Sequence, residues 1–112
     1  MDNTIYSESN VGKRLSRLKK SEIMELSYAG GYVPLVGTIK IGREKDNDIL
    51  IGDNLASRHH AIIQKIKDSY FIKDLNSTNG TFVNNSVVPK EKYIKLQKGD
   101  VIKIGRTEIV IQ

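Results

Sequence analysis

The sequence predicts an all-β protein, folded as an antiparallel sandwich or barrel, and two observations carry this prediction. From residue 22 onward, apolar and polar residues alternate with a period of two in many short runs, as they do in strands that bury one face. Turn-forming stretches such as Asn79-Gly80 and Asn84-Asn85 separate these runs. No helical pattern lies between them, and about ten closely spaced short strands are typical of sandwiches and barrels.

Each predicted strand is a run of β-branched or aromatic residues that ends in turn-forming residues. Met24, Leu26 and Tyr28 alternate with polar residues in the first run, and Ile39 and Ile41 do so in the next. The strands are expected at residues 24–28, 39–41, 49–51, 62–66, 70–75, 81–83, 94–96, 101–104 and 109–111. The turns between them are expected at residues 29–31, 46–48, 52–54, 67–69, 76–80, 84–85, 98–100 and 105–106.

Length and composition restrict the possible classes of protein further. A chain of 112 residues fits one small domain. It contains no cysteine, which excludes a disulfide framework, a thiolate zinc site and a thiol nucleophile. No apolar run approaches the roughly 20 residues that span a bilayer, and no signal-peptide pattern stands at the start. We therefore expect a cytoplasmic protein whose domain does not bind a membrane.

The net charge of +5 is concentrated at the start of the chain. Residues 1–20 hold five Lys or Arg against two acidic residues, which gives +3 and leaves +2 for residues 21–112. Val11, Leu15 and Leu18 recur there at helical spacing, and a basic amphipathic helix can bind nucleic acid or a membrane. Because these apolar anchors are few, we predict a flexible basic leader or linker at 1–21 and a folded domain at 22–112.

Three polar stretches break the strand pattern and hold the candidate binding residues. They are Gly42-Arg43, Ser57-Arg58-His59-His60 and Ser77-Thr78-Asn79-Gly80-Thr81. They supply guanidinium, hydroxyl, amide and backbone N–H donors, a set that suits an oxyanion such as phosphate.

Short strands allow these stretches to meet. The strand at 49–51 spans only roughly 10–13 Å at about 3.3 Å per residue, so the loops at its two ends lie within reach of Arg43. The strand at 62–66 leads the chain away from the second stretch, and the strand at 70–75 leads it back. This brings the third stretch beside the second. We therefore expect a donor-rich rim built from loops, a common place for a binding site on a β scaffold.

The same residues favour no enzymatic or metal chemistry. His59 and His60 could be metal ligands, but adjacent residues of a strand point to opposite faces, and no cysteine or carboxylate pattern completes a site. Ser57 with a histidine could indicate hydrolysis, yet no residue is evident that would orient the imidazole, and no Gly-x-Ser-x-Gly motif occurs. Walker and dinucleotide glycine motifs are absent as well. We expect no catalytic residue, no metal and no cofactor.

Several motifs occur in a fixed order along the chain. They are Ile41-Gly42-Arg43, Asn47-Asp48-Ile49, Ser57-Arg58-His59-His60-Ala61, the stretch from Asp74 to Asn84, and Gly99-Asp100-Val101-Ile102. In this order they resemble the forkhead-associated (FHA) domain family over about residues 22–112. The resemblance implies an FHA-type β-sandwich of about eleven mostly antiparallel strands (the SMAD/FHA-like fold), whose loops at one end grip a phosphothreonine peptide.

The resemblance also implies a role for each binding residue. Arg43 would bind the phosphate and brace the loops, Ser57 would donate its hydroxyl to a phosphate oxygen, and Arg58 would add a second cation. Thr78 would contact the phosphothreonine. Asn79 would hydrogen-bond the peptide backbone just after it.

Three further positions match residues that shape the loops in the family, namely Gly42, His60 and Gly80. His59 fills a variable position and inherits no role. The implied function is a non-catalytic adaptor in Ser/Thr-kinase signalling, which binds a phosphothreonine-containing protein or peptide. We expect a monomer that does not bind nucleic acid.

Two other hypotheses concern the leader. Nucleic acid or another polyanion could bind it, which predicts a steep salt dependence and no preference for phosphothreonine. The chain has few aromatic residues for stacking bases, which disfavours this function. A phosphorylated Thr4 could instead fold back onto the pocket, as tail threonines do in some FHA proteins, and would gain from a high effective concentration.

Overall fold

The computed structural model describes residues 24–28 and 31–112 of the chain. The predicted leader at 1–21, with Thr4, lies outside the described residues. The described part forms eleven strands and no helix, so it contains no helix that could cross a membrane. The strands are β1 (Glu25–Tyr28), β2 (Gly31–Pro34), β3 (Thr38–Gly42), β4 (Ile49–Leu50), β5 (Ala61–Ile66), β6 (Ser69–Asp74), β7 (Phe82–Val83), β8 (Ser86–Val87), β9 (Tyr93–Leu96), β10 (Val101–Ile104) and β11 (Thr107–Ile111).

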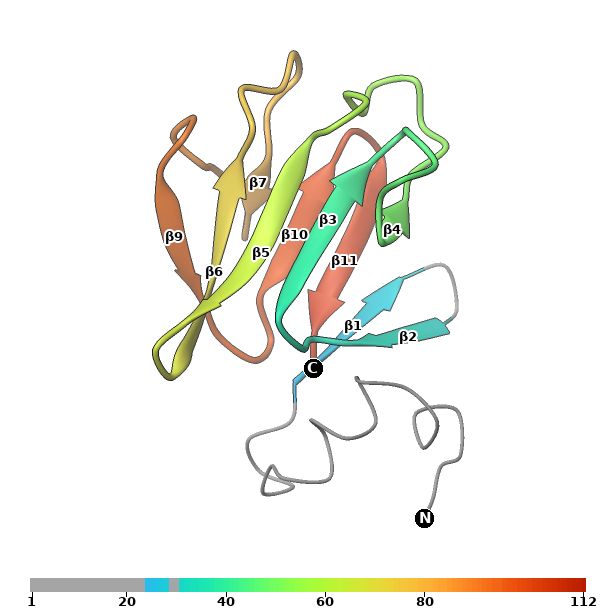
Figure 1. Cartoon of the computed structure of the whole chain (residues 1–112). Helices are drawn as coiled ribbons and strands as arrows, with labels where there is room; N and C mark the ends of the chain where they lie inside the picture. Colours follow the sequence, from blue (N-terminus) through green and yellow to red (C-terminus); the bar gives the residue numbers. More distant parts are fainter. Residues whose placement is uncertain (1–23, 29–30) are drawn as a thin grey trace.

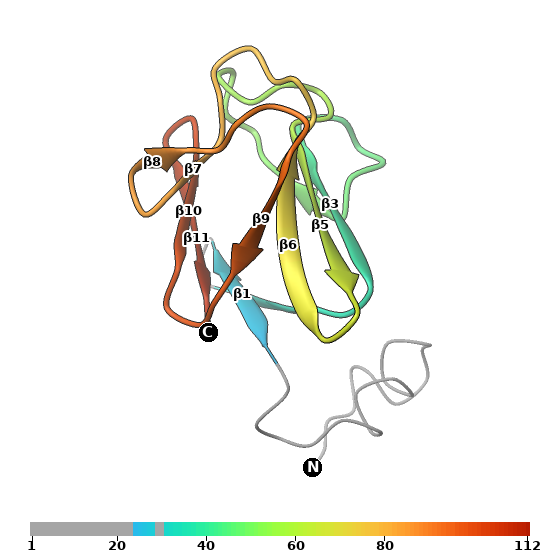
Figure 2. The same ribbon diagram turned by 90° about the vertical axis from the view of Figure 1, so that its left-hand side faces the viewer.

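The strands form two sheets packed face to face. One sheet has six strands in the order β2-β1-β11-β10-β7-β8, and the other has five in the order β4-β3-β5-β6-β9 (Figure 1). Among these strand pairs, only β3 with β4 is parallel. Figure 2 shows the two sheets as separate layers, with long loops gathered at the upper end. The predicted antiparallel sandwich is confirmed.

Alternation along the strands places the core between the two sheets. In β3, Ile39 and Ile41 are buried whereas Thr38 and Lys40 are exposed. Burial of such a side chain contributes roughly 1.5–3 kcal/mol, so the inward positions together stabilise the pairing register. The largest fully buried apolar side chains are Leu26, Leu35, Ile41, Ile49, Ile51, Ile63, Ile72, Ile102, Ile104, Ile109 and Ile111.

The two strands that the sequence pattern does not predict are the edge strands of the six-stranded sheet, β2 and β8. β2 begins at Gly31, which the pattern assigns to a turn, and ends at Pro34. An edge strand pairs on one side only, so it tolerates Gly and Pro, which would break a central strand. β8 has only two residues, too few to show an alternation.

Chain direction brings three loops to one end of the sandwich. β3 and β6 run toward this end and β5 runs away from it (Figure 1). The loops at residues 43–48, 51–60 and 75–81 therefore lie there together. These loops contain the three polar stretches that the sequence analysis singled out.

The turn between β10 and β11 supports the second of these loops. The backbone N–H of Arg106 donates to Asp53 Oδ2 at 2.6 Å. Gly105 adopts a φ of +59°, and a Cβ there would lie 2.6 Å from the same carboxylate oxygen. Only glycine allows this approach without strain.

Candidate functional site

Hydrogen bonds join the three loops at this end of the sandwich. The backbone N–H of Arg43 donates to the carbonyl of Ser57 at 3.1 Å, and the backbone N–H of Thr78 donates to Ser57 Oγ at 3.1 Å. The side-chain amide of Asn79 donates to the carbonyl of Leu55 at 2.9 Å. The structure thus brings together residues from all three polar stretches, and Ser57 lies where they meet.

Arg43 and Ser57 keep donors for a ligand. Arg43 Nε donates to the carbonyl of Ala56 at 3.0 Å, which fixes the guanidinium while both Nη groups make no hydrogen bond to the described residues. Ser57 Oγ accepts from the loop of Thr78, so its own O–H can donate outward. A fixed guanidinium with both Nη groups available presents the planar fork that matches phosphate.

A tight contact at Gly42 holds the first loop against the second. A Cβ on Gly42 would lie 2.3 Å from the carbonyl oxygen of Arg58 and 2.9 Å from Asn47 Nδ2. Asn47 Nδ2 donates to the carbonyls of Glu44 at 2.8 Å and Arg58 at 2.9 Å. Asn47 stands in one of the ordered motifs, but it was not among the predicted site residues.

A buried carboxylate lies directly beneath the rim. Asp74 is fully buried, and its Oδ1 accepts from Ser77 Oγ at 2.5 Å and from Thr81 Oγ1 at 2.6 Å. Its Oδ2 accepts from the backbone N–H of Ser77 at 2.9 Å, and Ser77 Oγ in turn accepts from the backbone N–H of Gly80 at 3.0 Å. This network fixes the loop between β6 and β7 from which Thr78 projects.

The network keeps Asp74 ionised. Burial alone would raise the pKa of this carboxyl group, but hydrogen bonds from Ser77 and Thr81 lower the pKa below its usual value. Sequence reasoning did not assign Asp74 to the site. A carboxylate at an inward position of an apolar strand was the signal that could have found it, because buried charges require partners.

His60 links the second loop to the third. Its side chain is fully buried, and Nδ1 accepts from the backbone N–H of Ser57 at 2.9 Å. Nε2 therefore carries the proton and donates to the carbonyl of Gly80 at 2.9 Å. Burial lowers the pKa of His60, against the opposing effects of the Gly80 carbonyl and Asp74, so the imidazole is neutral at pH 7.

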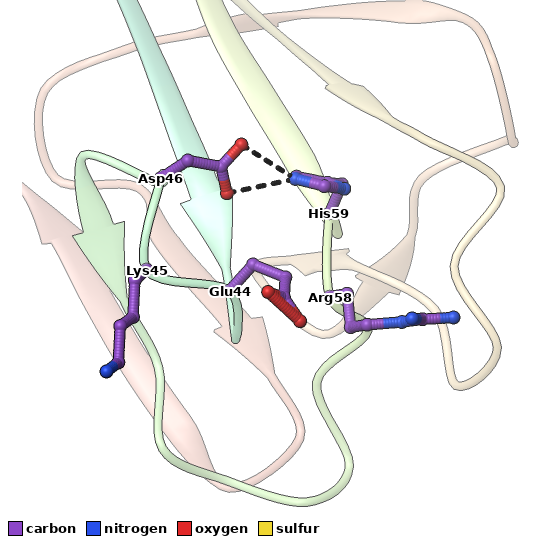
Figure 3. A pocket seen from close by; sticks show the side chains of 5 residues that line it. All are labelled: Glu44, Lys45, Asp46, Arg58 and His59. Atoms are coloured by element: carbon purple, nitrogen blue, oxygen red, sulfur yellow. Dashed lines mark hydrogen bonds and ion pairs between the residues drawn. The ribbon is translucent and has the colours of Figure 1, made fainter.

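Arg58 and His59 line a hollow beside the rim. The hollow has a volume of about 750 Å³ and is also lined by Glu44, Lys45 and Asp46. His59 Nε2 lies 3.0 Å from both carboxylate oxygens of Asp46, and this bond lowers the pKa of Asp46. In Figure 3 the Arg58 guanidinium points away from this pair.

The two adjacent histidines, which directly precede β5, differ sharply in burial. His60 is 0% exposed whereas the His59 side chain is 53% exposed. Within the described residues, no group of three or more His, Cys, Asp or Glu could hold a metal ion. His60 binds the backbone of Ser57 rather than its hydroxyl, so it is not placed to act as a general base on that hydroxyl.

The family model for the FHA domain matches residues 39–105, more than half of the chain. The chain belongs to the FHA domain family. The predicted resemblance is therefore confirmed, and the observed sandwich has the strand count that it implied.

Similar proteins support this assignment. The ABC transporter ATP-binding/permease protein Rv1747 of Mycobacterium tuberculosis is 45% identical over 74 residues, which are 66% of this chain but 8% of that protein. The oxoglutarate dehydrogenase inhibitor of Corynebacterium jeikeium is 40% identical over 65% of this chain and 49% of its own length. The chain thus spans less than half the length of each of these two curated relatives.

Solved structures share the fold. One comes from a structural and functional analysis of phosphothreonine-dependent FHA domain interactions. It is 35% identical with a TM-score of 0.73, and the match covers 80% of this chain and 95% of the solved chain. Mycobacterium tuberculosis EmbR in complex with a low-affinity phosphopeptide is 32% identical with a TM-score of 0.76 and covers 91% of this chain and 28% of its own.

Proposed function

We propose that this FHA domain binds phosphothreonine in a partner protein and acts as a non-catalytic adaptor in Ser/Thr-kinase signalling. One observation carries the proposal: the loops of Arg43 and Thr78 are both hydrogen-bonded to Ser57, beside an arginine whose Nη groups make no bond to the described residues. The domain is proposed to span 22–112, after a linker at 1–21, and to act in the cytoplasm as a monomer.

The chemistry of the rim suits a dianionic phosphate. Phosphothreonine carries about −1.5 to −2 charge near neutral pH and has three acceptor oxygens. The Arg43 Nη groups and the Ser57 hydroxyl would bind these oxygens, and Arg58 would add a second cation. Each charge-assisted hydrogen bond contributes roughly 1.5–3 kcal/mol. A peptide laid over loops buries little area, so the phosphate would supply a large share of the affinity.

The third loop would bind the threonine and its neighbour. Thr78 is exposed beside Ser57, where it would contact the phosphothreonine. Asn79 uses its amide nitrogen on the Leu55 carbonyl, which leaves its oxygen to accept from a peptide N–H. Gly42, His60 and Gly80 would act indirectly, by holding the loops in place.

Two relatives support the choice of ligand. The 35%-identical structure belongs to a study of phosphothreonine-dependent FHA domain interactions, and EmbR was solved with a phosphopeptide. The shared fold and the converging donors on the rim are the reasons to extend the ligand to this chain.

The test is a phosphothreonine peptide library, screened against the purified chain together with matched phosphoserine and unphosphorylated peptides. We expect strong selection for phosphothreonine, measured by calorimetry on the selected peptides. A single-stranded oligonucleotide is included as a polyanion control. Equal binding of the three peptide forms, or preferred binding of the oligonucleotide, would contradict the proposal.

A further inference from the structure

The outer face of the five-stranded sheet carries two cross-strand rows that lie away from the rim. Figure 1 looks onto this face, across β3, β5, β6 and β9. The strand register aligns one row as Lys40, Ile62, Lys73 and Tyr93, and the next row as Thr38, Gln64, Phe71 and Lys95. Apolar, aromatic and cationic side chains share these rows, and neither row contains a carboxylate.

Tyr93 contacts three other side chains of this face and is still 43% exposed. Its hydroxyl donates to Gln64 Oε1 at 2.5 Å. Its ring meets Phe71 edge to face, with centroids 6.4 Å apart and planes at 84°, and Lys73 Nζ lies 5.2 Å from its centroid. A fixed, exposed tyrosine among half-buried apolar side chains is typical of the residues that dominate protein interfaces.

The charge of the face is one-sided. Lys73 pairs with Glu91 at 3.5 Å at the border of the face, and Lys40 lies near enough to Asp46 to help lower the pKa of that carboxyl group. Lys95 forms no ion pair within the described residues. The outer face of the six-stranded sheet differs, because there Lys103 stands opposite Glu108 in the register. Within its two rows, the five-stranded face thus carries lysines without carboxylates around an apolar centre.

We propose that this face is a second docking surface, which binds an acidic and apolar segment of the same protein that carries the phosphothreonine. The proposal rests on the proposed function. Carboxylates of the segment would pair with the lysines of the face, because their charges are opposite. Aliphatic side chains of the segment would pack against Ile62 and Phe71. The leader at 1–21 is not the occupant, because it carries net positive charge.

Geometry allows both contacts at once. β5 has six residues, so the rows lie within roughly 20 Å of the rim at about 3.3 Å per residue. A flexible linker of about 14 residues has a typical end-to-end distance of that size. Binding at the rim would then raise the effective concentration of the acidic segment at the sheet.

The test uses two phosphothreonine peptides that differ only in a distal tail. Each carries a Gly/Ser linker of about 14 residues, followed either by a Glu/Leu tail or by the same tail with Lys in place of Glu. By calorimetry at low salt, we expect the acidic tail to tighten binding about fivefold or more relative to the basic tail. Lys95→Glu should abolish this advantage, and Lys103→Glu on the opposite sheet should leave it unchanged.

Equal affinity for both peptides, with each bound through its phosphate, would overturn the docking surface and leave the proposed function intact. Failure of both peptides to bind would instead contradict the proposed function. The face is then tested alone, by an NMR titration of the labelled chain with the unphosphorylated Glu/Leu tail. Shifts at the amides of Phe71, Tyr93 and Lys95 would support the proposal. Their absence, or tighter binding of a single-stranded oligonucleotide at the same residues, would overturn it.

Discussion

The rim and the polar layer directly beneath it both consist of polar side chains, but the two layers use their hydrogen-bonding groups in opposite ways. Beneath the rim, Asp74 receives three hydrogen bonds and His60 uses both ring nitrogens within the protein. On the rim, Arg43 uses only Nε within the described residues, and Ser57 Oγ acts as an acceptor. The lower layer satisfies its polar groups internally, whereas the rim leaves donors facing solvent.

This difference separates stability from binding. A buried polar group that loses its partner costs about 1–3 kcal/mol, so the lower layer should control the free energy of unfolding. An exposed donor binds water in the free protein, and the ligand replaces this water on binding. Substitutions on the rim should therefore change affinity with little effect on folding. Substitutions in the two layers can therefore test the division directly.

The largest effect on binding is expected from Arg43→Ala. This change removes the fixed guanidinium, and we expect phosphothreonine peptide affinity to fall by about a hundredfold or more, because several charge-assisted bonds are lost together. Calorimetry measures the affinity, and a urea titration shows that the chain still folds. Arg106→Ala, which removes another exposed arginine at this end, should bind normally. Retained affinity in a folded Arg43→Ala chain would contradict the site.

The largest effect on stability is expected from Asp74→Ala. Ser77 and Thr81 would each lose a buried acceptor, and we expect the free energy of unfolding to fall by about 3 kcal/mol or more. Chemical denaturation measures this loss. A stability close to that of the unmodified chain would show that the network does not support the loop. Glu108→Ala, an exposed carboxylate on the other sheet, serves as the control.

Ser57→Ala should lower the affinity for the peptide more than it lowers the stability of the fold. The phosphate of the peptide loses the hydrogen bond from the Ser57 hydroxyl, so we expect affinity to fall by about ten- to a hundredfold. The Thr78 N–H loses its acceptor as well, but this loop is exposed to water, so stability should fall by about 1 kcal/mol or less. Comparison of calorimetry with denaturation separates the two effects. A loss of stability as large as that of Asp74→Ala would place Ser57 in the lower layer.

The smallest effect is a pH dependence of stability in the absence of peptide. The folded pKa of His60 lies below its ordinary value of 6.5, so the unfolded chain binds more protons and stability falls as the pH drops below that value. The folded pKa of Asp74 is also lowered, from 3.8. A second loss therefore follows as the pH falls through the folded pKa of this carboxyl group.

Denaturation titrations between about pH 7.5 and pH 3 would show both steps. His60→Gln should remove the first step, and His59→Asn should keep it, because His59 is exposed. An unchanged first step in His60→Gln would assign the titration to another group.

Much of the fold follows from local sequence patterns. Alternation in β1 and β3 and the turn residues between strands predicted a sandwich or barrel, because a strand with one apolar face must bury it against another layer. The edge strands β2 and β8 were missed, since such short segments need no alternation to pair on one side. The positions of Arg43, Ser57 and Thr78 on one rim followed from strand length and strand direction.

The sequence by itself determined the class of the fold and the kinds of donor on its loops, because both depend on residue type and short-range spacing. Only the tertiary structure decided that Asp74 anchors the third loop, that His60 donates through Nε2, and that Asn47 clamps the first loop to the second. The His60 bond to Gly80 joins residues 20 positions apart, and the rows on the five-stranded sheet depend on register across four strands. Such contacts arise from packing and strand register, which no local pattern specifies.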